Sequence, residues 1–253
     1  HEYRKIFVTP ARTVKGVNFY QRHRTTLERA EKEFGVPAEI ITAVIGVETR
    51  YGENMGSFRV IDALSTLAFD YPPRSSFFSR ELKQYLMLTR EQSMPAAEML
   101  GSYAGAMGYG QFMPSSYRAY AVDFDGDNVI DIWKNPVDAI GSVANYFKAH
   151  GWRAGETVTV AAGVSEGYQP ELANDGLKPK RTVADFAAAG FRPVTPVPAD
   201  AMATAMEFEG SEALEHWLGL HNFYVITRYN HSAMYAMSVY QLSQELARAQ
   251  SSL

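Results

Sequence analysis

The segment Pro37-Ala-Glu-Ile-Ile-Thr-Ala-Val-Ile-Gly-Val-Glu-Thr-Arg-Tyr-Gly52 decides the fold of this 253-residue chain. Proline suits the first position of a helix, and residues 38–50 carry apolar side chains on nearly every side. Such a pattern predicts a helix inside a core. Ile41, Ile45 and Glu48 are spaced to share one face of that helix, so a carboxylic acid should lie at the edge of the core.

Glu48 has two interpretations at such an edge. Burial favours the protonated form of a carboxyl group, and a protonated Glu can act as a general acid. Alternatively, Glu48 is a rim residue that pairs with Arg50 or Arg74. The sequence fixes no second acid near it, so spacing alone does not indicate a glycosidase that uses two carboxylates.

The second informative stretch is the acidic segment Asp123-Phe-Asp-Gly-Asp-Asn-Val-Ile-Asp131. Oxygen ligands at alternate positions, followed by a backbone carbonyl, are how an EF-hand-type loop wraps Ca²⁺. Asn128 occupies the sharp-turn position, where a residue tolerant of positive φ is needed. Lys134 stands where the ordinary loop has its bidentate Glu, so we expect Asp138 to close a longer loop. The expected ligands are Asp123, Asp125, Asp127, the carbonyl of Val129, Asp131 and Asp138.

The alternative for this segment is a solvated acidic turn. Four carboxylates within nine residues repel one another unless a cation lies among them, which favours the cation site. We expect the ion to be structural Ca²⁺, because an ion caged by oxygen leaves little room for substrate. No organic cofactor is expected.

Composition excludes several functional classes. With 24 Lys and Arg against 28 Asp and Glu, the net charge of −4 argues against nucleic-acid binding. The absence of Cys excludes a disulfide framework, Cys-ligated zinc and a thiol nucleophile. HExxH and phosphate-loop motifs are also absent. No apolar run reaches the roughly 18 residues that a membrane-spanning helix needs.

The pattern along the chain predicts mostly helices, with a change of character after Gly151. Helices are expected over residues 19–34, 38–50, 136–150 and 232–249, from residue 115 onward, and over 62–104 with breaks at 71–73 and 95. Short apolar alternations between residues 155 and 230, with turns at Gly163, Gly167 and Gly176, predict a small β-rich part. We expect an N-terminal helical segment (1–36), a core (37–153) with the cation loop (123–138), a β-rich subdomain (154–229) and a C-terminal helix (230–253).

Four motifs occur in a fixed order. Glu48-Thr-Arg-Tyr-Gly52 is followed by Gly105-Ala-Met-Gly-Tyr-Gly-Gln-Phe-Met-Pro-Ser-Ser116, by the aspartate segment, and by Asp138-Ala-Ile-Gly-Ser-Val-Ala-Asn-Tyr-Phe147. Together they resemble the B family of bacterial lytic murein transglycosylases, the membrane-bound lytic transglycosylase B group. The resemblance runs from about Tyr20 to Trp152 and resumes at 228–232.

The resemblance implies a mainly α chain: a lysozyme-like catalytic core with an EF-hand-like loop, flanked by helices and a small β-rich subdomain (α+β). It implies that Glu48 is the single acid/base, and that the substrate bond is the β-1,4 link between N-acetylmuramic acid and N-acetylglucosamine in peptidoglycan. Glu48 would protonate the departing oxygen and then accept the proton of the C6 hydroxyl, which closes a 1,6-anhydro ring on C1.

The same resemblance implies a set of substrate contacts. Ser102 and Gln111 would line the groove beside the acid, and Tyr146 would stack on a sugar. A second wall would hold Tyr229, Asn230 and Tyr235, while Arg74 would meet an anionic group of the substrate. For each Tyr the alternative is a half-buried packing residue.

The expected partners are peptidoglycan glycan strands and other cell-wall enzymes, with no nucleic acid. The expected location is the bacterial periplasm, with outer-membrane attachment in a full-length form, and the expected state is a monomer. Some members of this family are lipid-anchored, and this chain has no Cys to carry a lipid. Two alternatives stay open: a hydrolytic muramidase that uses the same Glu, and a calcium-stabilised peptidoglycan-binding module without turnover.

Overall fold

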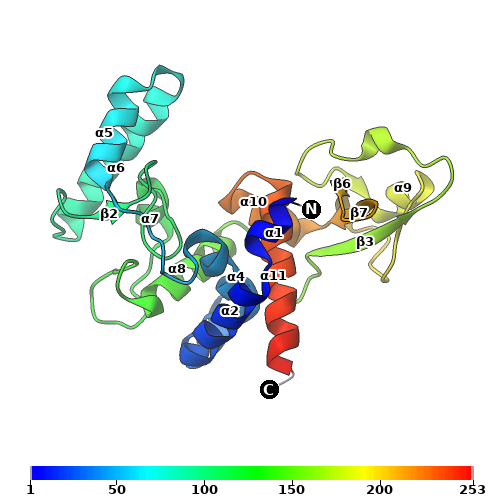
Figure 1. Cartoon of the computed structure of the whole chain (residues 1–253), viewed down its shortest axis with the longest axis horizontal. Helices are drawn as coiled ribbons and strands as arrows, with labels where there is room; N and C mark the ends of the chain where they lie inside the picture. Colours follow the sequence, from blue (N-terminus) through cyan, green and yellow to red (C-terminus); the bar gives the residue numbers. More distant parts are fainter. Residues whose placement is uncertain (1, 252–253) are drawn as a thin grey trace. The chain divides into compact units, whose positions relative to one another are not determined.

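The computed structural model describes residues 2–251, and these residues divide into two compact units (Figure 1). The helical unit comprises residues 11–149 with 246–251, and the sheet unit comprises residues 2–10 with 150–245. The C-terminal helix α11 (Ala233–Ser251) contributes its first part to the sheet unit and its end to the helical unit. The four-part division expected from the sequence stays a prediction.

The helical unit is built around α4 (Ala38–Thr49). The structure describes all of α4, and every residue of it except Glu39 and Glu48 is buried. This confirms the predicted core helix. It packs against α3 (Arg24–Phe34) and α8 (Pro136–Ala149), and Gly35 ends α3 with a φ of 74°.

The prediction of one continuous helix that begins at residue 19 and ends at residue 34 is wrong, because a first helix begins earlier and the helix is interrupted at His23. The chain instead forms α1 (Glu2–Phe7) and then α2 (Pro10–Arg22), which ends one residue before His23. α3 begins at Arg24. The apolar spacing continues through His23, so periodicity alone did not reveal the break.

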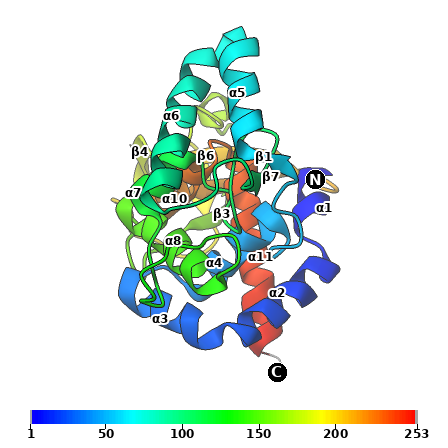
Figure 2. The same cartoon turned by 90° about the vertical axis from the view of Figure 1, so that its left-hand side faces the viewer.

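A helical hairpin follows α4. α5 (Val60–Asp70) and α6 (Ser75–Glu91) are joined by a 3-10 turn, Pro72–Arg74, and lie side by side (Figure 2). The predicted break at the proline pair is therefore confirmed. The prediction of a helix over residues 96–104 is wrong. Leu100–Gly101 forms the short strand β2, which pairs antiparallel with β1 (Phe58–Arg59) at the base of the hairpin.

Two further helices belong to the helical unit. α7 (Pro114–Tyr120) begins next to the predicted start at residue 115, and α8 confirms the helix predicted over 136–150. Between β2 and α7 runs the glycine-rich loop, residues 102–113. The acidic segment connects α7 to α8.

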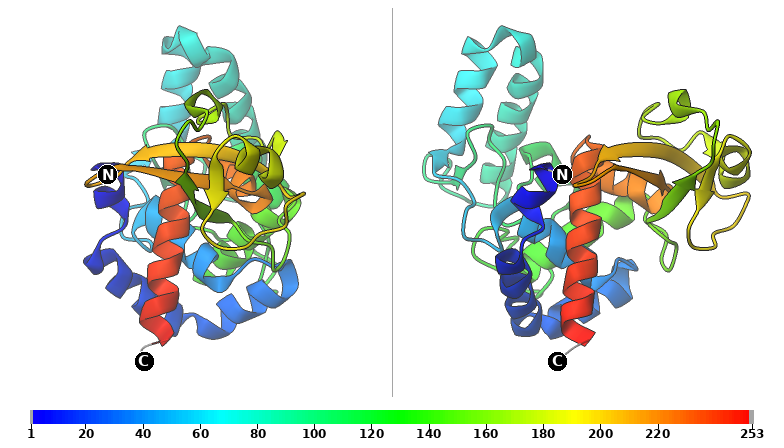
Figure 3. Two further views of the ribbon diagram at one scale, coloured as in Figure 1. Left: turned by 90° about the vertical axis from the view of Figure 1, so that its right-hand side faces the viewer. Right: turned by 45° about the vertical axis from the view of Figure 1, so that its right-hand side comes forward.

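The sheet unit contains five strands in the order β4-β6-β7-β3-β5, with every neighbouring pair antiparallel. Figure 3 shows these strands in yellow-green to orange from two directions. The elements of this region are β3 (Thr159–Val164), a 3-10 turn (Pro170–Leu172), β4 (Arg181–Thr182), α9 (Val183–Ala188), β5 (Phe191–Pro193), β6 (Met202–Glu209), β7 (Leu214–Gly219) and α10 (His221–Tyr229). Phe186, Phe191 and Leu218 lie in its core. The predicted turn at Gly163 is wrong, because Gly163 lies inside β3 and pairs with Arg192.

Candidate active site and cation loop

Glu48 lies in the last turn of α4. Its side chain is partly buried, and its sequence neighbours Val47 and Thr49 are both buried. Ile41 and Ile45, on the same face, have no exposed surface. This confirms that the carboxylic acid sits at the edge of the core. Directly after α4 the backbone turns sharply, with positive φ at Arg50 (52°) and Tyr51 (63°).

The turn after Glu48 is anchored from within the core. The Tyr51 hydroxyl donates a hydrogen bond to the carbonyl oxygen of Arg12 at 3.1 Å, and burial raises the pKa of this tyrosine. Two consecutive residues in the left-handed region cost free energy unless the surroundings hold them. The Tyr51 side chain, which is partly buried and hydrogen-bonded to Arg12, helps to hold the end of α4 in place.

The segment after Glu48 packs directly against the glycine-rich loop. Thr49 Oγ1 lies 2.9 Å from the carbonyl oxygen of Tyr109. Gly56 has a φ of 91°, and a Cβ atom there would lie 2.0 Å from the carbonyl oxygen of Gly101. Only glycine allows this approach of two backbones. The acid-bearing helix and the loop are therefore held in contact.

Ser102 and Gln111 both belong to this glycine-rich loop. The Ser102 hydroxyl oxygen accepts hydrogen bonds from the backbone N–H groups of Ala104 (3.2 Å) and Ala106 (3.0 Å). The Gln111 amide nitrogen donates to the carbonyl oxygens of Met55 (3.2 Å) and Gly108 (3.0 Å). Because Met55 lies in the segment that follows α4, the structure brings Gln111 against the chain next to the predicted acid.

After these hydrogen bonds, each of the two side chains still has one group that could bond to a substrate. Both lone pairs of the Ser102 oxygen accept, and within residues 2–251 no group accepts its proton. Both N–H groups of Gln111 donate, and among the same residues its carbonyl oxygen accepts from none. The loop therefore offers one hydroxyl donor and one amide acceptor.

Tyr146 extends from α8 and is only 8% exposed. Its ring lies 5.8 Å from that of Phe112 and 5.0 Å from that of Tyr120, measured between centroids. Phe112 follows Gln111 in the sequence, so Tyr146 is close to the glycine-rich loop. Most of its surface is used in packing.

Arg74 lies away from this arrangement. It is exposed in the turn between α5 and α6, with its guanidinium 4.6 Å from the ring centroid of Phe77. The eleven residues of α5 span about 16 Å, and the base of the hairpin at β1 and β2 is at their other end. The structure therefore does not bring Arg74 next to Ser102.

Tyr229, Asn230 and Tyr235 belong to the sheet unit and form one cluster there. The rings of Tyr229 and Tyr235 stack with centroids 6.4 Å apart and planes inclined by 10°. Asn230 follows α10 and is exposed. Tyr235 is 2% exposed, so it supports the ring of Tyr229 from below the surface.

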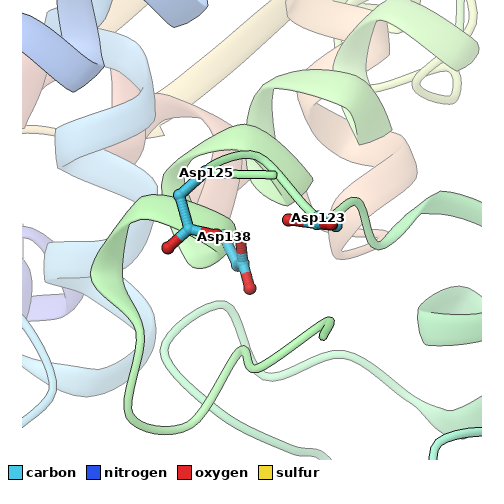
Figure 4. A group of neighbouring side chains, drawn as sticks. All are labelled: Asp123, Asp125 and Asp138. Carbon is cyan, nitrogen blue, oxygen red and sulfur yellow. The ribbon is translucent and has the colours of Figure 1, made fainter. Parts of the chain in front are cut away.

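The acidic segment folds back on the start of α8. Asp123, Asp125 and Asp138 each place a carboxylate oxygen within 4.8 Å of the others (Figure 4). Asp138 is fully buried and accepts hydrogen bonds from the N–H groups of Phe124 (2.7 Å) and Asp131 (2.9 Å). Burial raises the pKa of Asp138, whereas the side-chain hydrogen bond from Asn135 lowers that of Asp125.

The other predicted ligands have different surroundings. Asp127 accepts from the N–H of Val129 (2.8 Å), and Asp131 accepts from the N–H groups of Trp133 and Lys134 (both 2.9 Å). The Val129 side chain is exposed. Asn128 has a φ of 70°, which confirms the predicted sharp turn.

The donor set fits a hard divalent cation. Three carboxylates at this separation repel one another, and a buried carboxylate such as Asp138 needs compensation. Oxygen ligands in a flexible loop suit Ca²⁺ better than Mg²⁺, which demands a stricter octahedron.

Sequence reasoning missed two residues that organise these sites. Asn135 donates from its side-chain amide to Asp125 at 2.8 Å. Thr49 joins α4 to the glycine-rich loop. Thr49 directly follows Glu48 and Asn135 lies within the predicted loop 123–138, but their partners are 60 and 10 positions away in the sequence, and no local pattern marks them.

No helix among residues 2–251 has the length and apolar character needed to cross a membrane.

Comparisons with known proteins agree on one family. The model of the transglycosylase SLT domain matches residues 1–244. The membrane-bound lytic murein transglycosylase B of Escherichia coli K12 is 51% identical over 247 residues, which are 98% of this chain and 67% of that protein. The soluble lytic transglycosylase SltB1 from Pseudomonas aeruginosa superposes with a TM-score of 0.95 at 56% identity, covering 99% of this chain and 83% of that one.

A third relative bears on the acidic loop. The Escherichia coli lytic transglycosylase Slt35 in complex with calcium superposes with a TM-score of 0.92 at 49% identity, covering 98% of this chain and 78% of that one. These similarities extend over nearly the whole chain and include both units. The chain therefore belongs to the transglycosylase SLT domain family and has its lysozyme-like α+β fold.

Proposed function

We propose that this protein is a lytic transglycosylase of peptidoglycan and that Glu48 is its single acid/base. The observation that carries the proposal is the position of Glu48 at the fixed end of a buried helix, packed against the loop that bears Ser102 and Gln111. Membership of the SLT family and the murein transglycosylase activity in the name of its Escherichia coli relative support it.

The proposed reaction needs one carboxyl group. Protonated Glu48 gives its proton to the oxygen that links N-acetylmuramic acid to N-acetylglucosamine, and the bond from C1 to that oxygen breaks. The 2-acetamido group of the muramic acid stabilises C1. The Glu48 carboxylate then takes the proton of the C6 hydroxyl, whose oxygen bonds to C1. A 1,6-anhydro ring forms, Glu48 is protonated again and no water is consumed.

The hydrogen-bonding capacity of the glycine-rich loop suits this substrate. An acetamido group offers one carbonyl oxygen and one N–H. We assign the carbonyl oxygen to the Ser102 hydroxyl donor and the N–H to the Gln111 carbonyl acceptor. Tyr146, Tyr229, Asn230 and Arg74 are proposed as further substrate contacts, and Tyr235 is proposed to act there by holding the ring of Tyr229.

The acidic loop is proposed as a structural Ca²⁺ site. Asp123, Asp125 and Asp138 would supply carboxylate oxygens, with Asp127, Asp131 and the carbonyl of Val129 completing the shell. The calcium complex of Slt35 supports this proposal. We further propose that the protein acts on glycan strands in the periplasm, in line with the membrane-bound relative. We also propose that it is a monomer.

Mass spectrometry of the fragments that the protein releases from purified peptidoglycan tests the proposal. The wild type should release fragments that end in 1,6-anhydro-muramic acid, one water lighter than reducing ends, and Glu48→Gln should release none. Reducing ends would identify a hydrolytic muramidase. Glycan binding by both proteins, with no fragments from either, would identify a binding module.

A further inference from the structure

We propose that Thr49 is a positioning residue, whose hydroxyl fixes Glu48 relative to the glycine-rich loop. The inference rests on the proposed function, because it concerns how the acid of that reaction is held. Thr49 follows Glu48 directly and has no exposed surface. It therefore cannot touch the substrate, and any effect on the reaction must pass through its neighbours.

One hydroxyl group joins three segments here. Thr49 Oγ1 lies 2.9 Å from the carbonyl oxygen of Tyr109 and 3.1 Å from that of Ile45. The N–H of Gly52 donates to the same oxygen at 3.0 Å. The hydroxyl thus connects the last turn of α4, the sharp turn after it and a loop sixty residues away.

A buried threonine in a helix normally satisfies its hydroxyl within the helix. Thr42, one heptad earlier in α4, does so through a hydrogen bond to the carbonyl oxygen of Ala38 at 2.8 Å. Thr49 has the equivalent partner in Ile45, yet the carbonyl of Tyr109 is nearer. The Thr49 hydroxyl therefore has a hydrogen-bond partner outside α4 in addition to the one within it.

The other side of the glycine-rich loop is also held. The N–H of Tyr109 donates to the carbonyl oxygen of Ile132 at 3.0 Å, so the peptide groups around Tyr109 are fixed from both directions. Gln111 lies two residues further along. Without the Thr49 hydrogen bond, the end of α4 could shift relative to the glycine-rich loop. A shift of about 1 Å at a reacting group can lower the rate about a hundredfold.

The matched variants are Thr49→Val and Thr42→Val. Valine has nearly the shape of threonine, so each substitution removes one buried hydroxyl from the same helix. We expect Thr49→Val to lower kcat for fragment release at least tenfold with KM changed less than twofold. Thr42→Val should keep kcat within twofold of the wild type, and Thr49→Ser, which retains the hydroxyl, should recover most of the lost rate.

Hydrogen exchange gives a second readout that does not depend on activity. The Gly52 amide should exchange faster in Thr49→Val than in the wild type and keep its protection in Thr42→Val. Equal kcat losses in the two valine variants, or an unchanged Gly52 amide in Thr49→Val, would overturn the inference. Failure of the proposed function is recognised separately: the wild type itself would then release no anhydro fragments.

Discussion

The ring of Tyr51 occupies the space that a side chain at Gly46 would need. A Cβ atom built on Gly46 would lie 2.6 Å from Cζ of Tyr51, well inside van der Waals contact. Gly46 begins the last turn of α4, two residues before Glu48, and Tyr51 lies in the sharp turn that ends the helix. The glycine therefore allows the chain to fold back so that the tyrosine packs on the helix that carries the acid.

Gly46→Ala should lower the free energy of unfolding. In an open helix this change stabilises by up to about 1 kcal/mol, but overpacking a core costs about 1–3 kcal/mol. We expect the clash with Tyr51 to decide the sign, giving a melting temperature several degrees below that of the wild type. Gly163→Ala is the control, because among residues 2–251 no atom other than those of its chain neighbours lies within 4 Å of the added Cβ.

A double-mutant cycle locates the cause of this loss. In a Tyr51→Ala background the ring is gone, so adding Gly46→Ala should cost little further stability. An equal cost of Gly46→Ala in both backgrounds would show that the tyrosine is not responsible.

The sequence predicted correctly those features of the fold that are determined by residues close together in the chain. The apolar run of α4 and the positive φ at Asn128 follow from residues that are neighbours in the sequence. The strand at Leu100–Gly101 depends on a tertiary contact, since β2 exists only by pairing with β1. At Gly163 the pairing of β3 with β5 outweighs the turn preference of glycine.

The same distinction between local and distant causes holds for the residues of the candidate site. Glu48 and the aspartates were predicted because helix and loop periodicity set their places. The bond from Thr49 to Tyr109 joins residues sixty positions apart, and the fold alone brings them together.

Removal of calcium should destabilise the protein if the acidic loop binds it. A ligand that binds only the folded state adds about 2.7 kcal/mol when present at a hundred times its dissociation constant. We expect chelation to lower the melting temperature and added Ca²⁺ to restore it. Asp125→Asn should abolish most of this response, whereas Asp175→Asn, an exposed carboxylate outside the cluster, should leave it intact.

Glu81 should contribute strongly to the start of α7. This buried carboxylate accepts from both the N–H (2.9 Å) and the hydroxyl (2.7 Å) of Ser115. Leucine has no acceptor atom, so Glu81→Leu leaves the N–H and the hydroxyl of Ser115 without the partners that they have in the wild type. We expect a loss of about 1–3 kcal/mol in urea unfolding. The same change at exposed Glu98 should have no measurable effect, and equal losses at the two positions would refute the explanation.

Stability should fall in mildly acidic solution because of His23. Burial, aided by the charge of Arg22, lowers the pKa of this histidine below its usual 6.5, and its ring packs 4.6 Å from that of Phe19. The unfolded chain then binds a proton at a higher pH than the folded one, so the contribution of His23 is complete above pH 6.5 and is lost as the pH falls through the folded pKa. His23→Gln cannot titrate. Its melting temperature relative to the wild type should therefore rise as the pH is lowered from 8 to 5, and a difference that stays constant over this range would contradict the role of His23.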